Sequence, residues 1–168
     1  MKDTVSIVLW ITALNIIFFG VLNFGLAFLV RVFPKRFYNA NLAFYREQPF
    51  EKTLYIVLRV AKWKDRLPEG GRLVGFSKRT LESPNNEAYI SEFITETCIG
   101  EFVHYLGGTL GYFSLFLTFL VDGTTKHILV FIIIATLNFL GQVPFAIIQR
   151  YNRPRLIRLK NNLMRKYK

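Results

Sequence analysis

The sequence has a single cysteine, Cys98, so it can form neither an intramolecular disulfide nor a cysteine-based metal cluster. It contains no P-loop, no dinucleotide-binding fingerprint, and no H-E-x-x-H or G-x-S-x-G pattern. Acidic residues are also scarce, with 11 Asp and Glu against 22 Lys and Arg. The familiar nucleotide, zinc and serine-hydrolase motifs are therefore excluded, and we expect Cys98 to be a small packing residue.

The excess of basic residues does not indicate nucleic acid binding. The chain is 52% hydrophobic, its long uncharged runs stand next to basic clusters, and it has no recognisable nucleic-acid-binding motif. This pattern is typical of an integral membrane protein, whose partners are membrane lipids and not nucleic acid. The length suits one domain, so residues 1–168 are predicted to form a single membrane domain.

Three apolar runs predict transmembrane helices over residues 5–30, 102–121 and 128–148. None of the three runs contains Asp, Glu, Lys or Arg. At about 1.5 Å per residue the first run reaches roughly 39 Å, which exceeds the roughly 30 Å hydrocarbon core. A cleaved signal peptide is the alternative for this run, but the run is too long and lacks a small-x-small cleavage site at its end. The polar turn at 122–127 predicts that the second and third helices form an antiparallel hairpin.

Basic residues follow the first and third runs directly, whereas the turn between the second and third runs has one lysine and one aspartate. The positive-inside rule then gives the orientation. The N-terminus and the turn are predicted to lie outside the cell. Residues 31–101 and the basic tail 149–168 are predicted to lie in the cytoplasm.

The cytoplasmic segment is more than a linker. Residues 50–62 carry apolar side chains at helical spacing with three basic residues among them, which predicts an interfacial amphipathic helix. A short re-entrant span is the alternative, but Arg59 would interrupt it. Turn residues enclose a possible short strand at 73–76, and residues 86–101 are predicted to be helical and to continue into the second span. The predicted fold class is an all-α membrane protein with three spans, an interfacial helix and a cytoplasmic loop segment.

The second predicted span has one broad face that carries both ionisable and small residues. Glu96, Glu101 and His104 lie toward its cytoplasmic end, and Gly107 and Gly111 form a G-x-x-x-G pair that permits close helix packing. Acidic groups and a histidine facing a packed interior are costly unless something uses them, so they are candidates for catalysis. Two alternatives stay open: a purely local pair of Glu101 with His104, and a metal site, for which too few ligands are visible.

Two basic clusters border the spans. Residues 149–155, Gln-Arg-Tyr-Asn-Arg-Pro-Arg, fit either a generic anchor for anionic headgroups or a phosphate clamp. Residues 62–68, with Trp63 and Lys64, suit the headgroup zone. Polar residues inside the first and third spans are instead expected to make interhelical hydrogen bonds. They are Asn15, Asn23, Asn138 and Gln142.

Three segments, taken in order, resemble the glycosyl-4,4'-diaponeurosporenoate acyltransferases, small bacterial membrane enzymes of the staphyloxanthin-type carotenoid pathway. They are residues 62–68, the helix with Glu96-Thr97, Glu101 and His104, and the run Gln149–Leu156, which is the most specific. The resemblance covers residues 30–160. It implies transfer of a long-chain fatty acyl group from an acyl thioester to a sugar hydroxyl of a glycosylated carotenoid or related glycolipid. It also implies a bacterial cell membrane protein without a bound cofactor, with acyl-CoA as the expected co-substrate.

Acyl transfer to an alcohol needs a base and a group that stabilises the oxyanion. We expect His104 to be the base, with Glu101 or Glu96 orienting its imidazole, and Gln149 or Asn152 donating to the oxyanion. Basic and aromatic residues are expected to bind the phosphates of the acyl donor and to contact the lipid headgroups. These are Arg150, Arg153, Arg155, Trp63 and Lys64.

Two non-enzymatic functions remain as alternatives. A membrane scaffold for lipid-pathway enzymes would explain the spans and the basic tail but not the acidic residues and histidine on one face. A lipid or glycolipid carrier is less favoured because three spans are few and no inverted repeat is present. The sequence does not determine the oligomeric state, the acceptor or the acyl chain.

Overall fold

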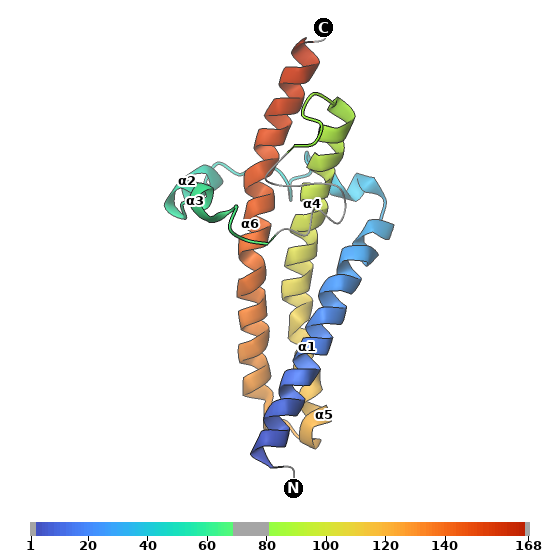
Figure 1. The fold of residues 1–168 in the computed structure, drawn as a ribbon, viewed down its shortest axis with the longest axis vertical. Helices are drawn as coiled ribbons and strands as arrows, with labels where there is room; N and C mark the ends of the chain where they lie inside the picture. The colour runs from blue at the N-terminus through green and yellow to red at the C-terminus, as the bar shows by residue number, and fades with distance from the viewer. Residues whose placement is uncertain (1–2, 69–80, 167–168) are drawn as a thin grey trace. The chain divides into compact units, whose positions relative to one another are not determined.

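The computed structural model describes residues 3–68 and 81–166, and this part of the chain is predominantly helical and contains no strand (Figure 1). The predicted all-α fold is confirmed for these residues, whereas the predicted strand at 73–76 lies outside them. The elements, in chain order, are α1 (Thr4–Leu29), η1 (Val30–Val32), η2 (Lys35–Tyr38), α2 (Glu51–Val57), α3 (Val60–Trp63), α4 (Glu87–Leu110), η4 (Gly111–Leu117), α5 (Thr118–Asp122) and α6 (Ile128–Lys166).

The chain divides into two compact units, which are described separately. Unit 1 comprises Met1–Val32 and Val103–Val143, and unit 2 comprises Phe33–Phe102 and Pro144–Lys168. The division falls within α4 and within α6, so each of these two helices contributes to both units.

Three helical stretches among the described residues are long and apolar enough to cross a membrane, as predicted. They are Thr4–Val32, Glu87–Asp122 and Ile128–Lys166. The second stretch combines α4, η4 and α5, which confirms that the helix beginning near residue 86 continues into the second predicted span.

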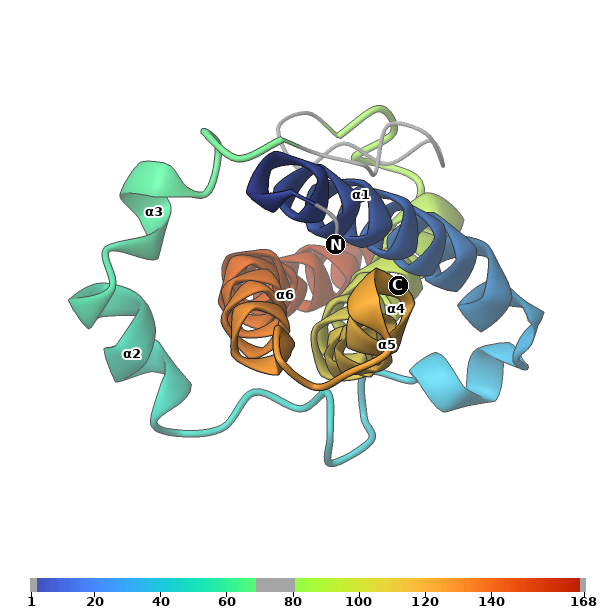
Figure 2. The same ribbon diagram turned by 90° about the horizontal axis from the view of Figure 1, so that it is seen from below.

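α1 begins at a side-chain cap. The Asp3 carboxylate accepts a hydrogen bond from the Ser6 backbone N–H at 2.7 Å, which satisfies one of the free donors at the helix start. In unit 1, α1 lies alongside the parts of α4 and α6 that belong to this unit (Figures 1 and 2). A small core of Ile11, Val121 and Phe131 joins α1, α5 and α6.

The turn between α5 and α6 has the predicted position. Gly123 ends α5 in the left-handed region with φ 75°, a conformation that glycine adopts without a steric penalty. The Asp122 carboxylate accepts hydrogen bonds from the backbone N–H and the hydroxyl of Thr124, at 3.0 and 2.8 Å. The chain is thus reversed within a few residues, as an antiparallel hairpin requires.

α6 is longer than its apolar run. It has 39 residues, or about 58 Å at about 1.5 Å per residue, and continues through Pro144 and Pro154 to Lys166. The residues after 148 therefore extend the third span as a helix. In unit 2 this extension packs against the first half of α4 through buried apolar side chains. These are Ile90, Phe93, Ile94, Leu156 and Leu163.

The predicted amphipathic helix at 50–62 is interrupted. Arg59 has φ 50° and ψ 41°, and this left-handed residue separates α2 from α3. The indole N–H of Trp63 donates to the Leu58 carbonyl at 2.8 Å and so satisfies an acceptor at the break. Ile56 and Val57 of α2 are 76% and 71% exposed, so the described part of the chain does not cover these two apolar side chains. Its contact with a bilayer interface remains a prediction.

Candidate functional site

The Glu101 carboxylate lies at the centre of a buried ion-pair network in unit 2. Its Oε1 accepts a hydrogen bond from Arg150 and its Oε2 accepts one from Arg153, each at 2.5 Å. The Glu101 side chain is completely buried, and that of Arg153 is 2% exposed. A buried carboxylate is stable when it is paired and fully hydrogen-bonded, and the two guanidinium groups of α6 meet this requirement.

The same two arginines bind the loop before α2. Arg153 donates to the Tyr45 carbonyl at 2.7 Å, and Arg150 donates to the carbonyls of Phe44 and Arg46 at 2.8 and 3.0 Å. The Arg153 guanidinium also lies 5.2 Å from the centre of the Tyr45 ring. Residues 44–46 belong to a turn in which Tyr45 and Arg46 donate to the Leu42 carbonyl, and the two arginines attach this turn to α6.

Nearly every N–H group of the two guanidiniums is used inside the protein. Arg153 also donates to the hydroxyl and the carbonyl of Thr97, both at 3.0 Å. Arg150 also donates to Oε1 of Glu51 at 2.7 Å. A guanidinium has five N–H donors, so little capacity is left for a phosphate group. The geometry favours a positioning role for these two arginines over the predicted phosphate binding.

Glu51, at the start of α2, completes the network. Its Oε2 accepts a hydrogen bond from the Tyr55 hydroxyl at 3.2 Å. Burial raises the pKa of Tyr55, and the neighbouring Glu51 carboxylate raises it further. Tyr55 therefore stays a neutral donor at physiological pH, and the network attaches α2 to α6.

His104 has a defined hydrogen-bond partner in unit 1. Its Nδ1 lies 2.7 Å from Oε1 of Gln142 on α6, and Nε2 of Gln142 donates to Oδ1 of Asn23 on α1 at 3.0 Å. Nδ2 of Asn23 donates in turn to the Phe19 carbonyl at 2.8 Å, which fixes the orientation of both amides. Because Gln142 presents an acceptor, neutral His104 carries its proton on Nδ1 and its lone pair on Nε2.

This arrangement differs from the predicted one. The prediction gave Glu101 or Glu96 the role of orienting the imidazole, whereas Nδ1 of His104 lies against Gln142 and both oxygens of Glu101 accept hydrogen bonds from arginines. Gln142 and Asn23 were expected to make interhelical hydrogen bonds, and they do. Sequence inspection did not assign them to His104, since the spacing between polar residues on separate helices does not say which pair meets.

The G-x-x-x-G face packs closely within unit 1. A Cβ at Gly107 would lie 2.9 Å from Oδ1 of Asn23, and one at Gly111 would lie 2.6 Å from Nδ2 of Asn138. Asn138 also donates to the Gly107 carbonyl at 3.3 Å. The predicted close helix contact is confirmed, and it holds the helices that carry His104 and Gln142 together.

The remaining predicted site residues have varied surroundings. The side chain of Gln149 packs against Gly100, and a Cβ added at Gly100 would lie 3.1 Å from it. Lys64 forms an ion pair with Asp65 at 2.6 Å. Asn152 and Glu96 are half-buried. Arg155 is exposed, and its guanidinium stacks on the Tyr151 ring at 3.8 Å from the centroid. Their predicted roles in substrate binding and catalysis stay predictions.

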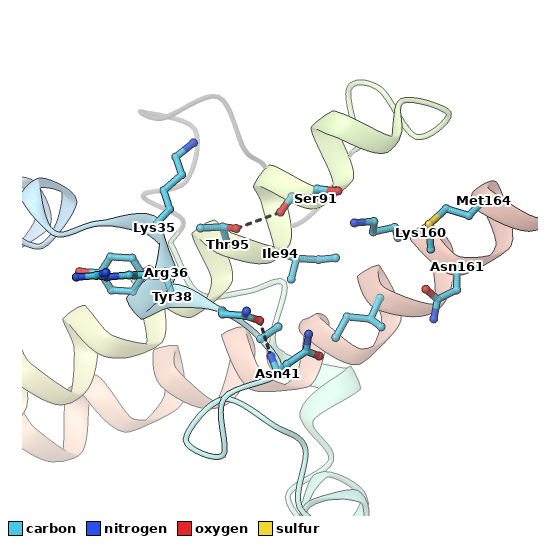
Figure 3. A pocket seen from close by; sticks show the side chains of 13 residues that line it. Lys35, Arg36, Tyr38, Asn41, Ser91, Ile94, Thr95, Lys160, Asn161 and Met164 are labelled. Carbon is cyan, nitrogen blue, oxygen red and sulfur yellow. Dashed lines mark hydrogen bonds between the residues drawn. The ribbon is translucent and has the colours of Figure 1, made fainter.

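Unit 2 has a cavity of about 510 Å³ lined by residues 35–41, α4 and α6 (Figure 3). Most of its polar lining is neutral, with Ser91 and Thr95 on α4 and Asn161 on α6. Three cations line it: Lys35 and Lys160 each lie 3.7 Å from a glutamate, and the Arg36 guanidinium lies 5.4 Å from the centre of the Phe37 ring. A second cavity of about 520 Å³ lies between α2, α3 and α6 and has a strongly basic lining.

In the described residues, no group of three or more His, Cys, Asp or Glu is placed to hold a metal ion.

Glu51 is the residue of the network that sequence inspection missed. It is an acidic residue in the first turn of the amphipathic segment, which by itself indicates only a helix start.

Comparison with known families identifies a family model that matches most of the chain. The model described as glycosyl-4,4'-diaponeurosporenoate acyltransferase matches residues 34–162, which include the Glu101–Arg150–Arg153 network, His104 and Gln142. No curated protein and no solved structure shows a significant match to the chain.

Proposed function

Because the chain belongs to the glycosyl-4,4'-diaponeurosporenoate acyltransferase family, we propose that it transfers a long-chain fatty acyl group from an acyl thioester to a sugar hydroxyl of a glycosylated carotenoid or related glycolipid. The family match supports the reaction class and the type of acceptor. The donor and the hydroxyl that is acylated are parts of the proposal.

The observation that carries the proposal within the structure is the hydrogen bond between His104 and Gln142 at 2.7 Å. It assigns the lone pair of the imidazole to Nε2 and fixes the plane of the ring. A general base requires a defined tautomer and a fixed orientation. Gln142 is a positioning residue in this proposal, and His104 is the catalytic residue.

The proposed reaction is a direct transfer. Nε2 of His104 takes the proton of the sugar hydroxyl while the hydroxyl oxygen forms a bond with the thioester carbonyl carbon. The C–S bond of the tetrahedral intermediate then breaks, and the imidazolium gives its proton to the departing thiolate. The products are an acylated sugar and a free thiol, and His104 returns to its neutral form.

The membrane is the expected location because both substrates carry long apolar chains. Three helical stretches in the described residues have the length and apolar character to cross a bilayer. The proposed topology keeps the N-terminus outside and the C-terminal part of α6 in the cytoplasm, in agreement with the positive-inside rule.

The test is acyl transfer by membranes that contain the protein. Membranes are incubated with a radiolabelled long-chain acyl thioester and purified glycosyl-4,4'-diaponeurosporenoate, and labelled glycolipid ester is separated and counted. We expect the parent protein to form the ester and the His104→Ala variant, inserted at the same level, to form none. If the parent protein transfers no acyl group to this acceptor or to a glycolipid extract, the proposed function is wrong.

A further inference from the structure

The cavity between α2, α3 and α6 is a basic groove. Its lining includes five cationic side chains and one acidic side chain, Glu47. The five cations, which define the basic groove hereafter, are Lys52, Arg59, Lys62, Arg155 and Arg158. They come from two separate parts of the chain, so the concentration of charge is produced by the fold and not by a single basic run.

These five cations differ from the other basic residues near the proposed site. Within residues 3–68 and 81–166, none of the five lies in an ion pair with a carboxylate, whereas Arg150, Arg153 and Lys64 all do. The five side chains are also exposed to solvent. Positive charges that converge on a concave surface and outnumber its one acidic side chain attract an anion.

Arg59 supplies a second, independent observation. It is the one residue other than glycine with positive φ in the described chain, at φ 50°. A left-handed conformation is strained for a residue with a side chain, and glycine would avoid this strain. The strain places a long cationic side chain on the basic groove at the break between α2 and α3, which indicates that the side chain has a use there.

Two aromatic rings hold the groove in shape. The guanidinium of Arg155 stacks on the Tyr151 ring and donates a hydrogen bond to the Tyr151 hydroxyl. The Tyr151 ring packs edge to face against that of Tyr55, with the centroids 5.3 Å apart. Arg158 is held by a hydrogen bond to the Pro154 carbonyl at 3.3 Å. The α6 side of the basic groove is therefore ordered before any ligand arrives.

We propose that the basic groove binds the phosphate groups in the nucleotide part of a coenzyme A thioester, the acyl donor. This inference rests on the proposed function for the identity of the donor. Arginine forks bind phosphate oxygens bidentately, and the cavity of about 520 Å³ falls in the range of roughly 300–1,000 Å³ typical of small-molecule sites. The proposed phosphate site therefore consists of Arg155 and the other four cations of the basic groove. It does not include Arg150 and Arg153, because nearly all of their N–H groups are used inside the protein.

The neighbourhood of the groove suits an amphiphilic ligand. Ile56 lines the groove, and both Ile56 and the adjacent Val57 are strongly exposed. A donor with charged phosphates and an apolar acyl chain can contact both kinds of surface. An anionic lipid headgroup offers the same phosphate chemistry, so the experiment must separate these two sources.

Binding to the purified full-length protein in zwitterionic nanodiscs is measured by calorimetry with three probes: coenzyme A, its 3'-dephospho form and pantetheine. We expect coenzyme A to bind, the dephospho form to bind more weakly, and pantetheine not to bind measurably. The double variant Arg155→Gln/Arg158→Gln should weaken coenzyme A binding about tenfold or more, since hydrogen bonds to charged groups contribute about 1.5–3 kcal/mol. The matched control Arg165→Gln/Lys166→Gln removes the same charge from exposed residues of α6 outside the groove and should bind like the parent.

Arg59 allows a test that separates binding from folding. In Arg59→Gly the left-handed conformation is no longer strained, so the melting temperature of this variant should stay level or rise while its affinity for coenzyme A falls. Arg59→Lys keeps the charge and should retain more of the affinity than Arg59→Gly. Equal binding by the parent and Arg59→Gly would argue against a ligand role for this side chain.

The outcomes separate the two proposals. If coenzyme A fails to bind the parent, or binds the groove variants equally well, the groove assignment is overturned even when acyl transfer is observed. If binding is lost in the groove variants but the parent transfers no acyl group, the groove assignment stands and the proposed function fails. If phosphatidylglycerol nanodiscs abolish coenzyme A binding and the groove variants lose affinity only for this lipid, the groove is a headgroup site and our assignment is wrong.

Discussion

Oε2 of Glu101 and Nη2 of Arg153 lie 2.5 Å apart in an ion pair that is almost completely shielded from solvent. The pair joins α4 to α6, and through the remaining N–H groups of Arg153 it reaches the Tyr45 carbonyl. Replacement of one partner would leave the other charge buried without compensation, which is among the most destabilising changes a protein can undergo.

Glu101→Gln should therefore destabilise the protein by about 3 kcal/mol, because it leaves Arg150 and Arg153 without their shared counter-charge. Arg153→Leu should have a similar effect by leaving Glu101 with one cation. The measurement is thermal unfolding of the purified protein in detergent, together with the amount inserted in membranes. Glu92→Gln is the control, since Glu92 is exposed and lies 3.7 Å from Lys35, and pairs of this kind contribute about 0–1 kcal/mol. Unchanged stability with a raised donor KM would instead restore Arg153 to phosphate binding.

Gln142→Leu should reduce kcat for acyl transfer about tenfold or more, because Nδ1 of His104 loses the acceptor that fixes its tautomer. Gln142→Glu keeps an acceptor toward Nδ1 and should retain more activity than Gln142→Leu, with the acceptor KM unchanged in both. His127→Ala is the matched histidine control, because His127 lies in the turn before α6 and pairs with Asp122 at 3.2 Å. A similar loss in the His127 variant would show that the assay responds to general destabilisation.

Substitutions of glycine should divide into two classes. Gly111→Ala should destabilise unit 1 by about 1–3 kcal/mol, because its Cβ would stand 2.6 Å from Nδ2 of Asn138. Gly20→Ala and Gly141→Ala place the Cβ in open space, with no atom within 4 Å, and should be neutral or stabilise by about 0.5–1 kcal/mol. Melting temperatures in one detergent would measure the difference. Equal effects at the three positions would contradict the close packing of the glycine face.

The proposed membrane orientation can be tested with single cysteines in a Cys98→Ala background. A membrane-impermeant maleimide should label Lys126→Cys, in the turn after α5, on intact cells. It should label Arg165→Cys, near the end of α6, only after the cells are opened. Labelling of both sites in opened cells is the positive control. Labelling of Arg165→Cys on intact cells would reverse the orientation.

The sequence correctly predicted three helices long and apolar enough to cross a membrane, the turn at 122–127 and the glycine face, because each of these features has a local cause. A continuous apolar run predicts a helix that can cross a membrane, and Asp122 with Gly123 predicts a turn. Two glycines four residues apart predict a close helix contact. The break at Arg59 was not foreseen in the same way. The apolar spacing of residues 50–62 continues through it, and nothing in the spacing indicates a left-handed residue.

The candidate site was only partly predictable. The sequence identified Glu101, His104 and the arginines of residues 149–155 as unusual, since charged groups on packed helices require partners. It did not identify the partners. Arg150 meets Glu101 49 residues away and Glu51 99 residues away, and Arg153 meets Tyr45 108 residues away.

By itself, the sequence determined that the chain is a helical membrane protein with an ionisable cluster and a basic strip, because hydrophobicity and charge are properties of each local segment. Only the tertiary structure decided that Glu101 pairs with two arginines, that Gln142 accepts a hydrogen bond from His104, and that five other cations converge on one groove. Those pairings depend on how the helices pack, and a side chain of fixed charge can serve as a structural counter-ion or as a ligand according to what the fold places beside it.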